Sequence, residues 1–294
     1  MFSVPHFVSH RARRPLAACA LLLAHCHTQG QAQDDATLPA LINAYRAQPL
    51  TCSGAAAAGV PALARNRVLA RLDMAPGVII APALEKLGYF AERADGISVT
   101  GAPDAATVMD TIRAGYCAVL RDGAYTELGV RRTGDDWTIV LAQPLVPLRA
   151  TLPPWRDAGR FILAASNAAR AQGRQCGDRY YGAAPALAWS GALADAAHAH
   201  SSDMAQRAYF SHTGKDGGGV IERAARQGYR YVRLGENIAF GQRTAQDVVD
   251  GWLASPAHCA NLMSAEFHDM GAAYALRGAQ RQTAYWTQVL GTAR

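Results

Sequence analysis

The sequence lacks several features that would assign a function at once. Its apolar stretch near the N-terminus runs for about ten residues, roughly half of what a membrane-spanning helix needs. It has no Cys-x-x-Cys pair, no Cys/His spacing of a zinc finger and no Gly-x-Ser-x-Gly motif of a serine hydrolase. The stretch "KDGGG" at residues 215–219 lacks the spacing and the Lys-Ser/Thr of a phosphate-binding loop, so we interpret it as a flexible turn.

The first 32 residues have the pattern of a secretory signal peptide. Arginines at positions 11, 13 and 14 precede the apolar run, and the small-x-small stretch at residues 30–32 follows it. Removing this segment lowers the formal net charge from +6 to +3, with 26 basic against 23 acidic residues left, and so small a charge indicates no nucleic-acid partner. A lipoprotein anchor at Cys26 is disfavoured by the bulky His25 before it. We expect an exported protein, periplasmic or extracellular, without a transmembrane segment.

Four cysteines remain after this cut, at positions 52, 117, 176 and 259. An even number in an exported chain indicates disulfides, and four cysteines allow three pairings. An internal repeat favours one of them, because residues 46–70 align without a gap on residues 170–194 with ten identities in 25 positions. Each copy then has an early and a late cysteine, which predicts the bridges Cys52–Cys117 and Cys176–Cys259. Free buried thiols are the alternative.

The two copies differ at the positions where the second copy has histidines and a glutamate. The stretch "YFSH" of the second copy has no counterpart in the first, Glu236 falls opposite Gly96, and His258 falls opposite Tyr116. All five histidines that follow the signal peptide lie in the second copy, namely His198, His200, His212, His258 and His268. We therefore expect any chemistry in the second copy, and in residues 36–150 a scaffold that has lost it.

Hydrophobic spacing in the second copy predicts helices first and strands last. One helix is expected over residues 161–171 and another after Ser190, with His200 on its buried face as a core histidine bonded to backbone. A capping box of Thr244 and Asp247 opens a third helix, which Ser255-Pro256 ends, leaving His258 on a turn. Residues 270–276 and 283–291 alternate as strands. This order predicts an α+β fold.

Imidazoles and a carboxylate are side chains that bind zinc or a similar divalent cation, and two histidines with one acid would leave a coordination position open. Without a metal, the same groups could act as an acid/base pair. Spacing alone does not bring His212 and His258 together, since they are 46 positions apart. No nucleophile is available, because the four cysteines are assigned to bridges.

Four motifs, in this order and spacing, resemble the CAP superfamily of cysteine-rich secretory proteins, antigen 5 and pathogenesis-related group 1 proteins. They are "AAHAHSSDMAQRAYFSH", "GYRYVRLGENIAFG", "VVDGWLASPAHCANLM" and "YWTQVLG", and they are most similar to the bacterial secreted branch, the SCP-domain proteins. The resemblance covers about residues 160–294 and reaches the first copy only through the repeat. It implies an α-β-α sandwich CAP domain over residues 155–294, preceded by a degenerate, shortened copy of the same fold.

The resemblance also implies site residues. The cleft of the family carries two histidines and two acidic residues, and in some members it binds zinc or another divalent cation. Its "SH" histidine is His212 here, its "GEN" glutamate is Glu236, and the histidine beside the bridged cysteine is His258. Many eukaryotic members have a second glutamate where this chain has Ser255, so a metal would have three protein ligands.

Three functional hypotheses follow. We expect a secreted, disulfide-stabilised, non-enzymatic protein whose His/Glu cleft binds a divalent metal, a small molecule, a lipid or an envelope component. The alternative is a metal-dependent, peptidase-like hydrolase that uses the same cleft, with Glu236 as a ligand or as a base. In the third, the cluster only joins loops of an interaction module. The resemblance implies no common reaction that would decide among them.

Overall fold

The computed structural model describes residues 6–9, 37–49, 51–52 and 57–294. Apart from residues 6–9, the expected signal peptide lies outside the described residues, and so does its cleavage point. Chain contacts divide the protein into two units, Met1–Leu145 and Val146–Arg294. Within the described part of the chain, no helix is both long and apolar enough to cross a membrane.

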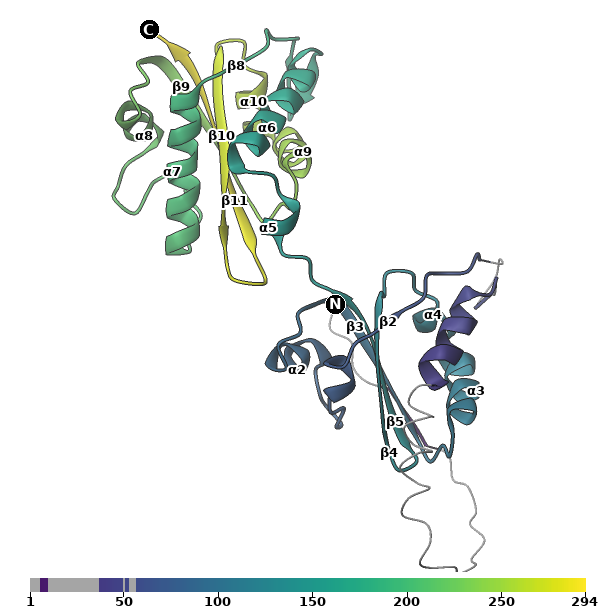
Figure 1. The fold of residues 1–294 in the computed structure, drawn as a ribbon. Coiled ribbons are helices and arrows are strands. Elements are labelled where there is room, and N and C mark those ends of the chain that lie inside the picture. Colours follow the sequence, from purple (N-terminus) through teal and green to yellow (C-terminus); the bar gives the residue numbers. More distant parts are fainter. Residues whose placement is uncertain (1–5, 10–36, 50, 53–56) are drawn as a thin grey trace, which may run out of the picture. The chain divides into compact units, whose positions relative to one another are not determined.

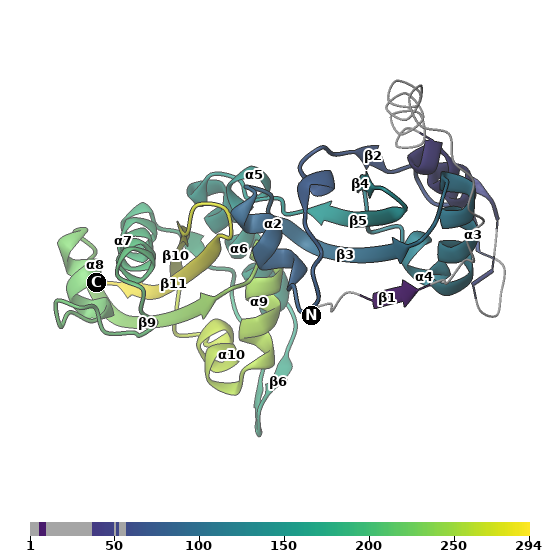
Figure 2. The ribbon, with the colours of Figure 1, turned by 90° about the horizontal axis from the view of Figure 1, so that it is seen from below.

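The first unit contains a sheet with helices on both faces. Its elements are the helical residues 37–47, β2 (Ala64–Arg65), the 3-10 helix η1 (Leu69–Arg71), α2 (Ile80–Lys86), β3 (Ala91–Thr100), α3 (Ala105–Gly115), α4 (Cys117–Leu120), β4 (Glu127–Thr133) and β5 (Asp136–Pro144). The strand order is β1-β3-β5-β4-β2. Strand β1 (His6–Ser9) belongs to the expected signal peptide and pairs in parallel with the end of β3 (Figure 2).

The second unit also has a mixed sheet with helices on both faces (Figure 1). Its sheet has the order β8-β10-β11-β9, and a separate hairpin joins β6 to β7. Its elements are α5 (Leu148–Thr151), α6 (Trp155–Arg170), β6 (Arg174–Cys176), β7 (Arg179–Tyr181), β8 (Ala188–Trp189), α7 (Gly191–Arg207), α8 (Val220–Arg226), β9 (Tyr231–Phe240), α9 (Ala245–Ala254), α10 (Pro256–Met263), β10 (Asp269–Arg277) and β11 (Thr283–Ala293). The predicted α+β fold is confirmed for this unit.

The second unit is built in three layers, with α7 and α8 on one face of the sheet and α6, α9 and α10 on the other (Figure 1). Successive side chains of β11 point to opposite faces of the sheet and pack in the hydrophobic core on each face. Trp286 and Leu290 pack against α6, α9 and α10, whereas Val289 packs against α7. Helix α7 approaches β10 so closely that a Cβ at Gly271 would lie 2.0 Å from the backbone nitrogen of Ala194. Only glycine fits there.

Local sequence signals begin and end the helices as predicted. The hydroxyl of Ser190 accepts a hydrogen bond from the backbone of Leu193 and opens α7. Thr244 and Asp247 form the capping box of α9, which ends at the extended residue Ser255. These caps fix where α7 and α9 start, and therefore which of their side chains face the sheet.

Both predicted disulfides form, each inside its own unit. Cys52 bonds Cys117 with their Cα atoms 5.4 Å apart, and Cys176 bonds Cys259 with a separation of 5.5 Å. The second bridge joins the β6–β7 hairpin to α10, the helix that carries His258. It therefore restrains one wall of the candidate site.

Each unit has a fully buried arginine, Arg46 in the first and Arg170 in the second. The guanidinium of Arg170 donates to the carbonyls of Pro185, Leu262 and Ser264 at 2.8 Å each and to that of Phe267 at 3.2 Å. The guanidinium of Arg46 donates in the same way to four carbonyls of the first unit, those of Pro61, Leu120, Asp122 and Tyr125. Each arginine thus joins its helix to the segment that follows the early cysteine and to the segment that follows the late cysteine.

Candidate functional site

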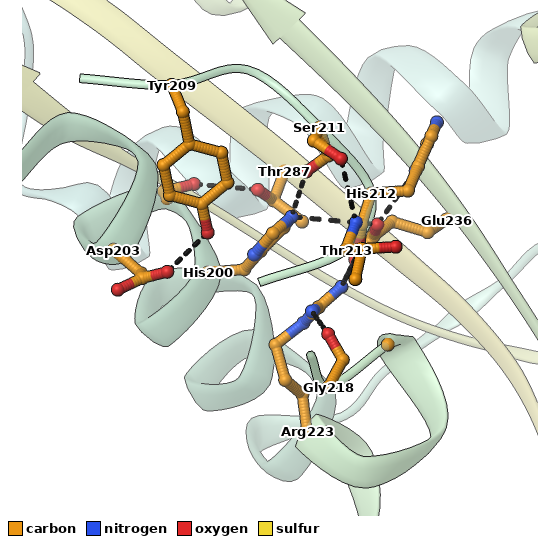
Figure 3. A network of polar contacts seen from close by, with 12 residues as sticks. His200, Asp203, Tyr209, Ser211, His212, Thr213, Gly218, Arg223, Glu236 and Thr287 are labelled. Atoms are coloured by element: carbon orange, nitrogen blue, oxygen red, sulfur yellow. Dashed lines mark hydrogen bonds and ion pairs between the residues drawn. The ribbon is translucent and has the colours of Figure 1, made fainter. Parts of the chain in front are cut away.

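Glu236 is the centre of a buried polar cluster in the second unit. It lies in β9, and 4% of its side chain is exposed. Its Oε1 atom lies 2.8 Å from Nδ1 of His212, and its Oε2 atom lies 2.6 Å from Nη2 of Arg223 (Figure 3). Both carboxylate oxygens are therefore paired, and the fold brings Glu236 and His212 into direct contact.

His212 is presented by the loop after α7. The helix ends at Ala208, which has a φ of 53°, and the hydroxyl of Tyr209 then donates to Asp203. The carboxylate of Glu236 can only accept, so Nδ1 of His212 carries the hydrogen and the lone pair of the neutral ring lies on Nε2. With 57% of the side chain exposed, Nε2 is available to a ligand.

His200 supports this loop from inside the fold. It lies on α7 with 1% of its side chain exposed, and its Nε2 donates to the carbonyl of Ser211 at 2.9 Å. The same nitrogen is 3.8 Å from Oε1 of Glu236. Burial lowers the pKa of His200, so the ring is neutral at pH 7. The prediction of a core histidine bonded to backbone is confirmed, and its partner is the residue that precedes His212.

Arg223, on α8, is the site residue that the sequence did not reveal. Its Nη1 atom donates to the carbonyl of Gly218 at 3.0 Å, and its Nη2 atom donates to the carbonyl of His212 at 3.0 Å as well as to Glu236. These partners lie 5, 11 and 13 positions away in sequence. No helical or strand period predicts such contacts, because they depend on how the loop before α8 folds back over β9.

His258 lies in a helix, which corrects the prediction of a turn. Pro256 ends α9 and is also the first residue of α10, a position where its missing N–H breaks no helical hydrogen bond. The Nδ1 atom of His258 is 2.9 Å from the hydroxyl of Ser255. Its pKa is lowered mainly by burial and further by the nearby ring of His212.

A chain of buried amides ties α10 to β9. Asn237 is fully buried, and its Nδ2 atom donates to Gln288 at 3.0 Å and to the carbonyl of His258 at 3.2 Å. Asn261 donates to Asn237 at 3.0 Å and to the carbonyl of Glu236 at 3.3 Å. Because these amides are paired with one another, they hold the helix of His258 at a fixed place beside the strand of Glu236.

The donor set available to a metal is smaller than the predicted three ligands. Glu236 already pairs both oxygens, and each histidine uses Nδ1 within the protein. Over the residues that the structure describes, no group of three or more His, Cys, Asp or Glu side chains could hold a metal ion. The imidazole nitrogens without a partner among these contacts are Nε2 of His212 and Nε2 of His258, and Glu236 orients His212 from behind. Zinc binding itself stays a prediction.

Residues 163–290 match the model of the CAP family, described as the cysteine-rich secretory protein family. This range runs from within α6 into β11 and includes His212, Glu236 and His258. The second unit is a CAP domain.

Relatives and solved structures match parts of the chain. YkwD of Bacillus subtilis (strain 168), an uncharacterized protein, is 34% identical over 96 residues, which cover 33% of this chain and 35% of the relative. The uncharacterized membrane protein YlbC of the same organism is 33% identical over 85 residues, 29% of this chain and 25% of that protein. The chain thus spans about a third and a quarter of their lengths. An extracellular SCP-domain protein of Bacillus anthracis str. Ames matches with 23% identity and a TM-score of 0.40, over 53% of this chain and 52% of that one.

Proposed function

We propose that this chain is an exported, disulfide-stabilised protein whose CAP domain binds a divalent cation at the imidazole pair of His212 and His258 and catalyses no reaction. Export is supported by the signal-peptide pattern and by the two disulfides, since such bridges persist in oxidising compartments. Cation binding is supported by the chemistry of the two imidazoles, whose nitrogen donors suit zinc and similar metals.

The pairing of Glu236 is the observation that carries this proposal. Arg223 and His212 each take one carboxylate oxygen, so the glutamate orients His212 and fixes its tautomer. In metal sites, a histidine ligand commonly donates its other ring N–H to a carboxylate in this way. With two protein ligands and solvent filling the other positions, we expect a modest affinity. The same two nitrogens could instead accept hydrogen bonds from a small molecule or an envelope component.

The pairing also favours binding over hydrolysis. A general base must take a proton from the attacking water, and both oxygens of Glu236 already accept hydrogen bonds from Arg223 and His212. Catalytic zinc sites generally hold the metal with three protein ligands, one more than the imidazole pair supplies. We therefore propose the metal-dependent hydrolase only as the second candidate function.

We further propose that residues 36–150 are a degenerate, shortened copy of the CAP fold. Three observations support this. Strand order β3-β5-β4-β2 in the first unit corresponds to β9-β11-β10-β8 in the second. The disulfides connect corresponding elements, and Arg46 and Arg170 bond corresponding carbonyls. The long helix α7 corresponds only to the short η1.

Loss of the site in this copy is supported by the packing at Gly96. Gly96 is the sixth residue of β3, as Glu236 is of β9. A Cβ at Gly96 would lie 2.3 Å from the sulfur of Met74 and 3.0 Å from Cδ1 of Ile80. Apolar side chains thus fill the space where the second unit has its carboxylate, and the first unit serves as a scaffold.

Calorimetric titration of zinc into chelator-stripped residues 33–294 tests the proposed function. We expect saturable one-to-one binding that His212→Ala and His258→Ala each abolish. His268→Ala is the matched control, because His268 is exposed in the same domain and, within the described part of the chain, forms its hydrogen bonds through the backbone. Absence of zinc binding by the parent would refute the cation site, and a loss that His268→Ala shares would refute its location.

A further inference from the structure

We propose that Arg223 acts as a built-in cation that keeps Glu236 out of metal coordination and thereby limits the affinity of the cleft for divalent cations. This inference rests on the proposed imidazole-pair site and adds the residue that determines its selectivity. It concerns Arg223, Glu236 and the loop that joins them.

The first step is charge compensation. Glu236 has 4% and Arg223 has 7% of its side chain exposed. A carboxylate buried to this extent requires a partner of opposite charge. His200 lies farther from the carboxylate, with its Nε2 atom 3.8 Å from Oε1, and His212 is mostly exposed to solvent. Among the described neighbours, Arg223 therefore supplies the permanent positive charge beside Glu236.

The second step is that the guanidinium is held in place. Its hydrogen bonds to the carbonyls of Gly218 and His212 anchor it to two points of the loop between α7 and α8. That loop is closed on itself, since the backbone nitrogen of Gly214 donates to the carbonyl of Gly218 at 2.8 Å. Moving Arg223 away from Glu236 would break these bonds together. The planar guanidinium, which several hydrogen bonds hold in place, is thus a fixed part of the site.

The third step is competition. A metal ion at Oε2 of Glu236 would displace a hydrogen bond of 2.6 Å and would lie next to the positive charge of Arg223. Like charges at such distances repel strongly inside a protein, where screening by water is weak. The metal is therefore left with the imidazoles of His212 and His258. Removing the guanidinium removes the repulsion and frees the carboxylate as a third ligand.

Zinc calorimetry of Arg223→Gln tests this inference, because glutamine retains an amide donor for the loop carbonyls but no charge. We expect zinc to bind at least about tenfold more tightly than to the parent, within the range that changes around metal ligands produce. Arg223→Lys retains the charge and should show no gain. Arg226→Gln is the matched control, since Arg226 lies on the same helix and pairs with Asp216 at the surface. Adding Glu236→Gln to Arg223→Gln should remove the gain.

Unchanged zinc affinity in Arg223→Gln, or an equal gain in Arg223→Lys, would overturn the inference while leaving the imidazole-pair site in place. If the parent binds no zinc and Arg223→Gln does, the inference stands and the proposed cation site of the parent falls. If neither binds, both fall. Should Arg223→Gln fail to fold, refolding with zinc decides, because recovery of the folded state supports a metal in place of the guanidinium and no recovery contradicts it.

Discussion

The sulfur of Met74 lies where a side chain at Gly96 would begin, 2.3 Å from the position of the missing Cβ. The surrounding cluster is apolar and includes Leu69, Leu72 and Ile80. A carboxylate placed there would meet the apolar side chains of Met74 and Ile80, in place of the guanidinium that Arg223 provides to Glu236.

Gly96→Glu should therefore destabilise the protein and create no zinc site. Burying an uncompensated carboxyl group among apolar side chains costs about 2 kcal/mol or more. Urea unfolding of the full chain measures the loss. Gly115→Glu is the control, since Gly115 is exposed at the end of α3 and nothing lies near its missing Cβ. Equal stability of the two variants would show that the space beside Gly96 is not filled.

Arg170→Gln should lower the free energy of unfolding by about 3 kcal/mol, because several buried carbonyls lose their donor at once. Arg46→Gln should have a similar effect through the equivalent carbonyls of the first unit. Denaturant titration of both variants provides the comparison. A large effect at one arginine and none at the other would contradict the proposed duplication.

Removing the second disulfide should destabilise the CAP domain. The bridge Cys176–Cys259 spans 83 positions, and in the chain-entropy account closing a loop of that size contributes about 4 kcal/mol. The double variant Cys176→Ser/Cys259→Ser, compared with the parent in urea under non-reducing conditions, measures this contribution. No loss of stability would show that the bridge is not a stabilising element of the domain.

Local rules account for much of the fold. Ser190 and the pair Thr244–Asp247 are short-range hydrogen-bonding patterns, and the structure confirms the helix starts that they predict. The alternation in residues 283–291 predicts the strand β11, but not that helices cover both of its faces, since its side chains are buried continuously from residue 284 to residue 291. The internal repeat predicts the disulfides, since each copy contributes an early and a late cysteine.

The site depends on contacts that no local rule contains. The Ser255-Pro256 pair predicts the end of α9 correctly, but the same proline is the first residue of α10 and places His258 in a helix. Arg223 reaches Glu236 across 13 positions, and the loop before α8 holds its guanidinium in place through the carbonyls of His212 and Gly218. The contact between His212 and Glu236 is implied by the family resemblance and could not be derived from their spacing.

The pH dependence of stability should reflect the buried neutral His200. Its folded pKa lies below the unfolded value of about 6.5, because burial disfavours the charged ring. The unfolded chain takes up a proton as the pH falls through 6.5 while the folded chain does not, so stability falls over that interval and is unaffected above it. Unfolding free energies at pH 7.5, 6.0 and 5.0 should show a smaller decrease in His200→Gln than in the parent. An unchanged slope, with His268→Gln as control, would contradict a neutral His200.

The most direct test of the imidazole-pair site is to observe the ring nitrogens themselves. Two-bond proton–nitrogen correlation spectra of ¹⁵N-histidine-labelled residues 33–294, recorded during a zinc titration, report which nitrogen of each ring binds the metal. We predict that zinc shifts Nε2 of His212 and of His258, that Nδ1 of His212 keeps its hydrogen, and that His200 is unchanged. Zinc-dependent shifts at Nδ1 of His212, or no shift at either ring, would contradict the account.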